Sequence, residues 1–127
     1  MNPLTLEWVN KAEGDTITAR RELRARISPN YDAACFHAQQ TAEKYLKAYL
    51  QENGANIPKT HQLVDLLGLC IKIDKTNQTL YSDVMILEGY AVKFRYPGES
   101  AEKWEAKEAY QATQNVRQAI RAKLGLA

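Results

Sequence analysis

The stretch from Tyr31 to Leu50 constrains the fold of this chain more than any other part of it. Its apolar and small residues recur in alternating steps of four and three, the spacing that keeps side chains on one side of a helix. The residues of this stripe are Tyr31, Cys35, Ala38, Ala42, Tyr45 and Tyr49. We therefore predict a long helix with a buried stripe, which the Asn53-Gly54 pair ends.

The opposite side of the same predicted helix is polar. It carries Gln39, Gln40, Glu43, Lys44, Lys47 and Gln51. We expect this side either to be solvated or to meet a polar partner. Ala34, Ala38 and Ala42 are small, so a neighbouring helix can approach closely there. The helix is therefore expected at the centre of a bundle.

Length and composition are those of an ordinary single domain spanning residues 1–127, with 45% hydrophobic and 25% charged residues. The formal net charge of +2 is too small to indicate nucleic-acid binding by itself. Cys35 and Cys70 both lie in apolar helical patterns, which favours buried free thiols in a reducing compartment over a disulfide or a metal site. Met1 is not followed by a signal peptide, and no apolar run reaches membrane-spanning length, so we expect a cytoplasmic protein.

Four more helices follow from the same periodicity, at about residues 4–27, 60–70, 80–94 and 100–123. Thr60 and Ser100 are the expected N-caps of the third and last helices of the chain. In the first helix the residues expected to face inward are Trp8, Ala12, Ala19, Leu23 and Ile27. No segment shows sustained strand alternation. The predicted fold class is all-α, an antiparallel up-and-down bundle of four long helices plus one shorter helix.

The end of the first predicted helix, Arg20 to Arg26, is strongly basic. One interpretation is a helix C-terminus whose cations complement the helix dipole. The other is a patch for phosphate or an acidic partner. We favour the first, because exposed charge on a helix needs no partner to explain it.

Three stretches of the sequence, in this order and separated by predicted helices, resemble the HEPN family of small helical domains. The alanine-rich segment HAQQTAEKYLKA at residues 37–48 resembles the family's QxAEKxLKA helix. PKTHQL at residues 58–63 resembles its PKTHDL turn, and FRYPG at residues 94–98 resembles its xRYP turn. Trp8 and Ala12 fit the family's opening helix, so the resemblance covers nearly the whole chain.

The resemblance implies a helical bundle that commonly forms a homodimer. It also implies frequent association with a separately encoded minimal nucleotidyltransferase, in two-gene modules that often behave as toxin and antitoxin. Many HEPN proteins are metal-independent ribonucleases that carry an arginine, four to six intervening residues and then a histidine. Histidine can exchange a proton near neutral pH, and arginine stabilises charge that develops on the phosphate.

That ribonuclease motif is absent from this sequence. The positions at the required distance after Arg95 are Ser100, Ala101 and Glu102, and no arginine stands at that distance before His37 or His61. Arg95 therefore retains the phosphate-binding half of such a site without the matching base. We assign no catalytic residue, no metal ligand and no cofactor.

Arg95 and Tyr96 precede a predicted helix N-terminus, where free backbone donors favour anions, so a phosphate pocket between Arg95 and Ser100 is chemically reasonable. The alternative is that Arg95 pairs with a carboxylate and Tyr96 packs to hold the turn. Lys59 and His61 flank another helix start in the same manner. His61 is an acid or base candidate, but such a lone histidine is more often a packing and hydrogen-bonding residue.

Lys44 and Lys47 are candidates for binding nucleotide phosphates, with Glu43 orienting one of them. The alternatives are a solvated polar face or an intramolecular network that joins Glu43 and Lys44 to Arg95 from a neighbouring helix. We favour the network, because residues that recur across a family resemblance can be structural as easily as functional.

The sequence and its resemblance together predict a HEPN-like component of a two-gene nucleotidyltransferase module that binds a nucleotide, RNA or the partner protein. The expected binding residues are Arg95, Tyr96, Lys44, Lys47, Lys59 and His61, supported by Glu43 and Ser100. One alternative is a ribonuclease with an unusual site in which His61 or Tyr96 acts beside Arg95. The other is a ligand-free structural dimer, in which carboxylates neutralise the lysines and Arg95.

Overall fold

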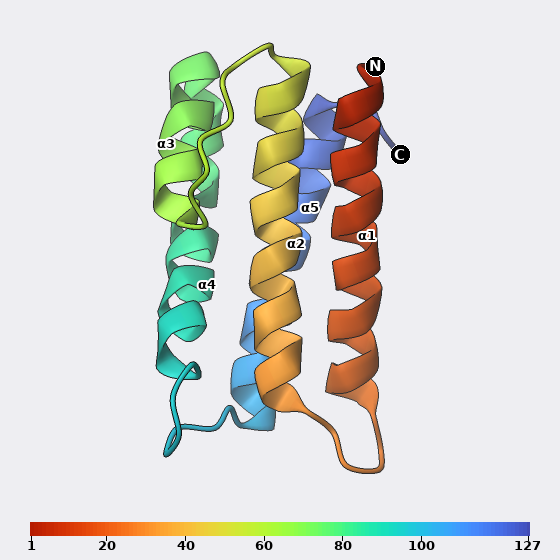
Figure 1. Cartoon of the computed structure of the whole chain (residues 1–127), viewed down its shortest axis with the longest axis vertical. Helices are drawn as coiled ribbons and strands as arrows, with labels where there is room; N and C mark the ends of the chain where they lie inside the picture. The colour runs from red at the N-terminus through yellow and green to blue at the C-terminus, as the bar shows by residue number, and fades with distance from the viewer.

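Helices make up nearly all of the structure, a computed structural model that describes all residues 1–127 (Figure 1). Five α-helices and one 3₁₀-helix follow one another without a strand: α1 (Pro3–Arg24), α2 (Tyr31–Glu52), α3 (Leu63–Ile73), η1 (Lys75–Leu80), α4 (Tyr81–Lys93) and α5 (Lys103–Lys123). The predicted all-α bundle is confirmed. Three of the helices, α1, α2 and α5, have 21 or 22 residues, whereas α3 has 11 and α4 has 13.

Helices that follow one another in the sequence run in opposite directions, with one exception. The connection from α2 to α3, residues 53–62, runs back along the outside of the bundle before α3 begins (Figure 1). As a result α2 and α3 point the same way. This returning connection lies over α2 and forms part of the site described below.

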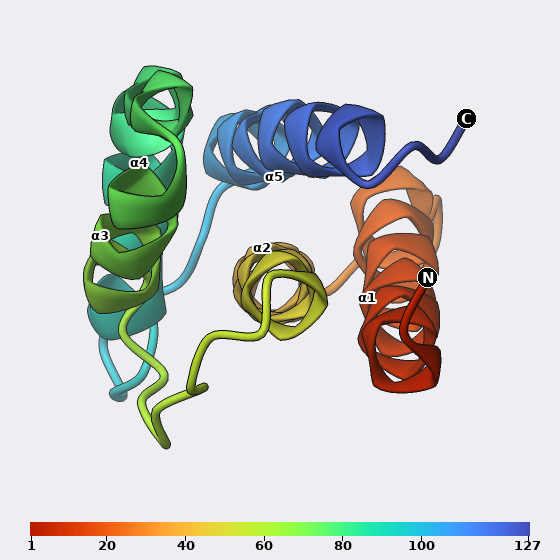
Figure 2. The same cartoon turned by 90° about the horizontal axis from the view of Figure 1, so that it is seen from above.

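The central position predicted for α2 is confirmed. Seen along the bundle axis, α2 lies between α1 on one side and α3 and α4 on the other, with α5 across a third side (Figure 2). Five members of the predicted stripe are buried and Tyr31 is half-buried. The small side chains permit a close approach, since Thr113 Oγ1 of α5 donates a 2.6 Å hydrogen bond to the carbonyl of Ala38.

The polar side of α2 is more buried than a solvated face would be. Gln39, Glu43 and Lys47 are each less than 9% exposed. The cover is the 53–62 connection, where the Gln39 amide donates to the carbonyl of His61 at 3.3 Å, together with Trp8 of α1. Of the two expectations for this side, solvation is therefore wrong for these three residues, which meet polar and aromatic partners within the chain.

Helix α1 ends three residues earlier than predicted. Ala25 is extended, with ψ 131°, and the chain then turns through Ser28, whose φ is +49°. The prediction that Ile27 faces inward is therefore wrong, and its side chain is 87% exposed. The turn ends at Asn30, whose side chain accepts a 2.9 Å hydrogen bond from the backbone N–H of Ala33 and caps α2.

Neither Thr60 nor Ser100 is an N-cap. The Thr60 hydroxyl accepts from the backbone N–H of Gln62, the residue at the N-cap position of α3, so Thr60 stabilises a turn before the helix. Ser100 is exposed, and Glu102 occupies the N-cap position of α5. Helix α5 starts later than predicted because Ala101 is tied to α2, its backbone N–H donating to Asp32 Oδ1 at 2.6 Å.

No helix is predicted from the sequence between residues 70 and 80, yet residues 75–80 form the 3₁₀-helix η1. Its Asn77 is completely buried, and Asn77 Nδ2 donates to the carbonyl of Cys70 at 2.9 Å. The same carbonyl, near the end of α3, also accepts from the backbone N–H of Asp74 at 3.0 Å, so Asn77 adds a second donor there. A buried asparagine in a polar stretch gives no local sequence signal.

Cys35 and Cys70 are buried free thiols, as predicted. Burial raises the pKa of each thiol to about 12. None of the five α-helices combines the length and the hydrophobicity that a membrane span requires.

Candidate phosphate-binding groove

A groove of about 1060 Å³ lies between α2, α4 and the 53–62 connection. We call it the α2–α4 groove. The residues that line it are Asp32, Cys35, Phe36, Gln39, Gln40, Lys59, Thr60, His61, Gln62, Glu88, Tyr90, Ala91, Val92, Phe94 and Arg95.

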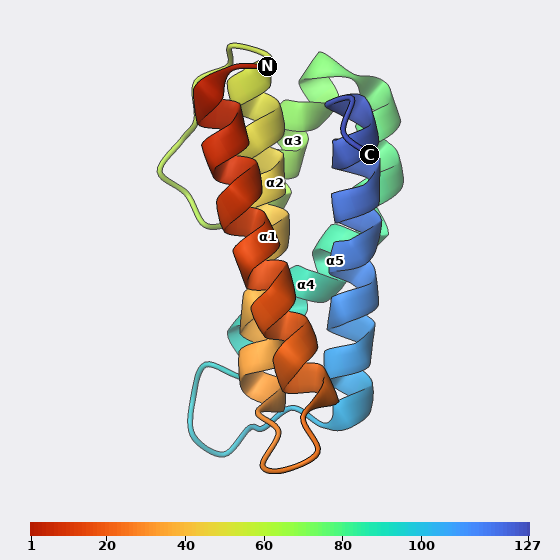
Figure 3. The same ribbon diagram turned by 90° about the vertical axis from the view of Figure 1, so that its right-hand side faces the viewer.

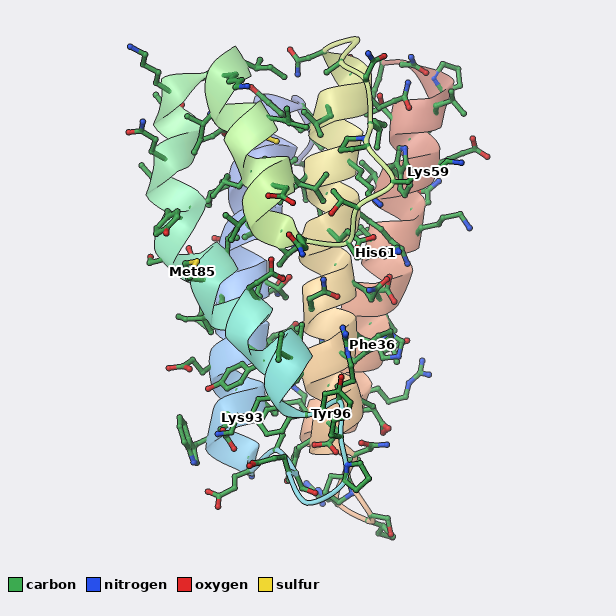
Figure 4. The ribbon with its side chains drawn as sticks, turned by 60° about the vertical axis from the view of Figure 1, so that its left-hand side comes forward. Phe36, Lys59, His61, Met85, Lys93 and Tyr96 are labelled. Atoms are coloured by element: carbon green, nitrogen blue, oxygen red, sulfur yellow. The ribbon has the colours of Figure 1, made fainter.

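Three of the predicted binding residues meet at this groove. Lys59 and His61 come from the 53–62 connection, and Arg95 comes from the turn that follows α4. Figure 4 shows Lys59 and His61 on the strip of chain that crosses α2. Lys59 and Arg95 have no ion pair, so both cations are available to an anion that enters the groove.

His61 is held by a buried carboxylate. Its Nδ1 lies 3.3 Å from both carboxylate oxygens of Glu43, and Lys47 Nζ lies 3.1 Å from Glu43 Oε2. An ionised carboxylate only accepts hydrogen bonds, so Nδ1 donates and Nε2 remains as the outward ring nitrogen. The His61 side chain is 82% exposed, while Glu43 and Lys47 are buried beneath it.

Lys47 does not line the groove, because it is enclosed within this network. Its ammonium group pairs with Glu43 and also lies 5.5 Å from the centroid of the Trp8 ring. Removing one member of such a pair leaves an uncompensated buried charge, which makes Lys47 and Glu43 structural partners. The predicted network of Glu43 and Lys44 with Arg95 is therefore wrong. Glu43 is joined to Lys47 and His61 instead, and neither Lys44 nor Arg95 takes part.

Lys44 lies in a separate cluster between α1 and α2. It forms an ion pair with Asp15, whose other carboxylate oxygen lies 2.8 Å from His37 Nδ1. The Asp15 side chain is 11% exposed, so this pair is largely shielded from water. Lys44 is not among the residues that line the groove.

The start of α5 does not provide the free donors expected near Ser100. The backbone N–H of Ala101 donates to Asp32, and that of Glu102 donates to Glu105 Oε1 at 2.9 Å. Carboxylates of the chain therefore already accept from these two donors beside Ser100. Tyr96 points outward, 65% exposed, and does not line the groove (Figure 4).

The sequence reasoning did not select Asp32, Glu88 and Phe36, which also line the groove. Both carboxylates accept from backbone N–H groups, Asp32 from Ala101 and Glu88 from Val64 at 3.4 Å. Phe36 is 56% exposed on the outer side of α2. It stands one position after Cys35 of the buried stripe, and a large apolar residue off that stripe is the signal that could have identified it.

No three His, Cys, Asp or Glu side chains gather in a group that could hold a metal ion. The groove offers two cations and aromatic rings, together with the carboxylates of Asp32 and Glu88, which backbone N–H groups already engage. Lys59 and Arg95 attract anions, and Phe36 provides an exposed ring face.

Comparison with known proteins decides the family. A model of the HEPN domain matches residues 5–123. The chain belongs to the HEPN family. The HEPN family predicted from residues 37–48, 58–63 and 94–98 is thereby confirmed.

Two solved structures share the HEPN fold of this chain. TT1696 from Thermus thermophilus is 27% identical, with a TM-score of 0.82, over 97% of this chain and 99% of that one. ST0689, an archaeal HEPN homologue, is 22% identical, with a TM-score of 0.74, over 94% of this chain and 96% of that one. No functionally curated protein matches the chain.

Proposed function

We propose that this HEPN protein binds a phosphate-containing ligand, a nucleotide or RNA, in the α2–α4 groove without cleaving it. One observation carries the proposal: Arg95 and Lys59, from two separate connections, line the same groove, and neither has a carboxylate partner. A planar guanidinium and an ammonium group suit phosphate, and the exposed ring of Phe36 suits a base.

Two features support binding without catalysis. The chain has two histidines, and neither follows Arg95 in the sequence. His61, the one in the groove, directs Nδ1 to Glu43 and so ties the 53–62 connection to α2. A ribonuclease needs a base within hydrogen-bond reach of the ribose hydroxyl and a second group for the leaving oxygen. The competing ribonuclease hypothesis requires His61 Nε2 to act alone beside Arg95.

The test is binding of fluorescent ATP and of a short labelled single-stranded RNA to the purified protein, followed by length analysis of the recovered RNA. We expect saturable binding of intact ligand. Because charge-assisted hydrogen bonds contribute about 1.5 kcal/mol or more, Arg95→Ala and Lys59→Ala should each weaken binding roughly tenfold. Lys72→Ala, which removes an exposed cation from α3, is the matched control and should leave the affinity unchanged.

Each other outcome has a definite meaning. RNA that is shortened by the wild-type protein and left intact by Arg95→Ala would establish the ribonuclease hypothesis instead. Equal loss of affinity in Lys72→Ala would mean that the contact is nonspecific. Absence of binding to ATP and RNA would reject the ligand site and leave the groove to a protein partner.

A protein partner is the second candidate, because large apolar side chains are exposed beside the same groove. Phe36, Val92 and Tyr96 are 56%, 61% and 65% exposed. Figure 4 shows Phe36 and Tyr96 on the same side of the molecule. Such side chains are typical of interface cores. Under this proposal the partner is a second copy of the chain or the minimal nucleotidyltransferase of a two-gene toxin–antitoxin module.

A further inference from the structure

A second, smaller hollow lies at the end of the bundle where α1 ends and α5 begins. Its volume is about 640 Å³. Figure 3 shows the end of α1, the turn to α2 and the first part of α5 together at this end of the molecule. The side chains of interest are Arg24, Arg26, Lys103 and Lys107, with Tyr31 and Tyr110. We call this hollow the basic cleft.

The charge of the basic cleft is entirely positive. Four of its nine lining residues are cations and none is acidic. The chain has seventeen basic and fifteen acidic residues, so thirteen basic residues remain elsewhere against all fifteen acidic ones. The local charge is thus opposite in sign to that of the rest of the molecule. Electrostatic attraction of anions is concentrated at this end.

The four cations have no partners within the chain. Six lysines and arginines elsewhere in the bundle form ion pairs with carboxylates, for example Lys93 with Glu105 and Arg117 with Glu13. None of the four cleft cations takes part in an ion pair or a side-chain hydrogen bond, and all four are exposed. Two come from the end of α1 and two from α5, so the convergence is a product of folding.

The two tyrosines give the cleft aromatic walls. Tyr31 and Tyr110 are half-buried. The Tyr110 hydroxyl accepts hydrogen bonds from Arg20 Nε at 2.9 Å and from Gln114 Nε2 at 3.1 Å, which hold the ring in place. A fixed aromatic ring beside unpaired cations is the combination that binds single-stranded nucleic acid, since bases stack while phosphates pair with the cations.

We propose that the basic cleft binds the phosphates of a single-stranded nucleic acid. The proposal does not depend on the α2–α4 groove, because Arg95 and Lys59 do not line the cleft. A recessed cleft with ring walls suits a flexible strand, whose phosphates can enter it, better than a flat lipid surface. The basic segment at the end of α1 is thereby assigned a ligand that its sequence alone did not require.

The test measures the affinity for a short single-stranded RNA in an Arg95→Ala background, which disables the groove, as a function of salt. Four contacts predict a slope of log affinity against log salt of about −2.8, and Arg24→Ala/Lys107→Ala should reduce it to about −1.4. With this slope, each cation–phosphate contact increases the affinity about fivefold at 0.1 M salt. The double variant, which removes two contacts, should therefore bind about 25-fold more weakly. The four side chains are exposed, so the melting temperature should not change.

Lys11→Ala/Lys72→Ala is the matched control, because it removes the same charge from two exposed lysines outside the cleft. We expect its affinity and salt slope to equal those of the background protein. Equal weakening by this control, or an unchanged slope in Arg24→Ala/Lys107→Ala, would reject the cleft as a site. Binding to anionic vesicles with none to RNA would also overturn the proposal. An effect of Arg95→Ala alone bears only on the groove.

Discussion

At the scale of single residues, Glu13 is the strongest electrostatic anchor between the first and last helices. Its carboxylate accepts from Arg117 Nε and Nη2 at 2.7 and 2.8 Å and from the Tyr45 hydroxyl. The hydrogen bonds from Arg117, the largest cause, and from Tyr45 lower the pKa of Glu13 to about 2. A carboxyl whose pKa is depressed in the folded state stabilises it above its unfolded pKa and loses that contribution as the pH falls.

We therefore expect Glu13→Gln to lower the free energy of unfolding at pH 7 by about 1–2 kcal/mol, a value reduced by solvent screening because the side chain is 30% exposed. The difference from wild type should shrink as the pH falls from 4.5 towards 2. Urea denaturation of both proteins at pH 7, 4 and 3 measures this difference in the free energy of unfolding. Glu7→Gln on the exposed side of α1 should show no such trend, and a pH-independent difference for Glu13→Gln would contradict the assignment.

At the scale of helices, Glu105 joins the end of α4 to the start of α5. Its side chain is buried, with Oε1 accepting from the backbone N–H of Glu102 and Oε2 pairing with Lys93 Nζ at 2.9 Å. Because this carboxylate satisfies a free donor at the helix start, Glu105→Ala should lower the free energy of unfolding by about 1 kcal/mol or more.

Ser100→Ala is the informative comparison, because Ser100 was the N-cap that the sequence suggested. Its hydroxyl caps nothing, so we expect a change below about 0.5 kcal/mol. Chemical denaturation of both variants measures the difference. A larger loss in Ser100→Ala than in Glu105→Ala would mean that α5 starts earlier than described.

At the scale of the whole molecule, the exposed apolar side chains beside the α2–α4 groove bear on self-association. If a second copy covers them, the wild-type protein sediments as a dimer, and Phe36→Asp or Val92→Asp, which would bury a charge in the interface, should give monomers of unchanged melting temperature. Ile17→Asp, at an exposed apolar position on α1, is the control and should remain dimeric. A wild-type monomer at all concentrations would reject self-association and favour a different partner chain.

The helices were predictable because their signals are local. The stripe that contains Ala38, Ala42 and Tyr45 repeats within a few residues, and the same repeat placed every α-helix within a few residues of its observed ends. The errors were at helix ends. Ile27 fits the helical period of α1, but the chain has already turned away at Ser28. Ser100 is a residue type that caps helices, but Asp32, far away in the sequence, binds the backbone N–H of the next residue, Ala101.

The candidate site was predictable only in its parts. The motif resemblance selected Lys59, His61 and Arg95 one by one, and the fold brings all three to one groove. It also selected Lys44 and Lys47, which pair inside the protein with Asp15 and Glu43. A lysine on a polar helix face has the same local sequence whether water or a carboxylate lies opposite it. The sequence therefore could not distinguish lysines that are free to bind a ligand from lysines that are paired within the protein.

The sequence by itself therefore determined the helical class, the central place of α2 and the HEPN family, because helical periodicity and short motifs are encoded in neighbouring residues. Only the tertiary structure decided which charges are free. The return of residues 53–62 over α2 buried Glu43 and Lys47, and the meeting of α1 with α5 gathered Arg24 and Lys107 into one cleft. Pairing between charges depends on distances across the fold, and these arise only when the helices pack.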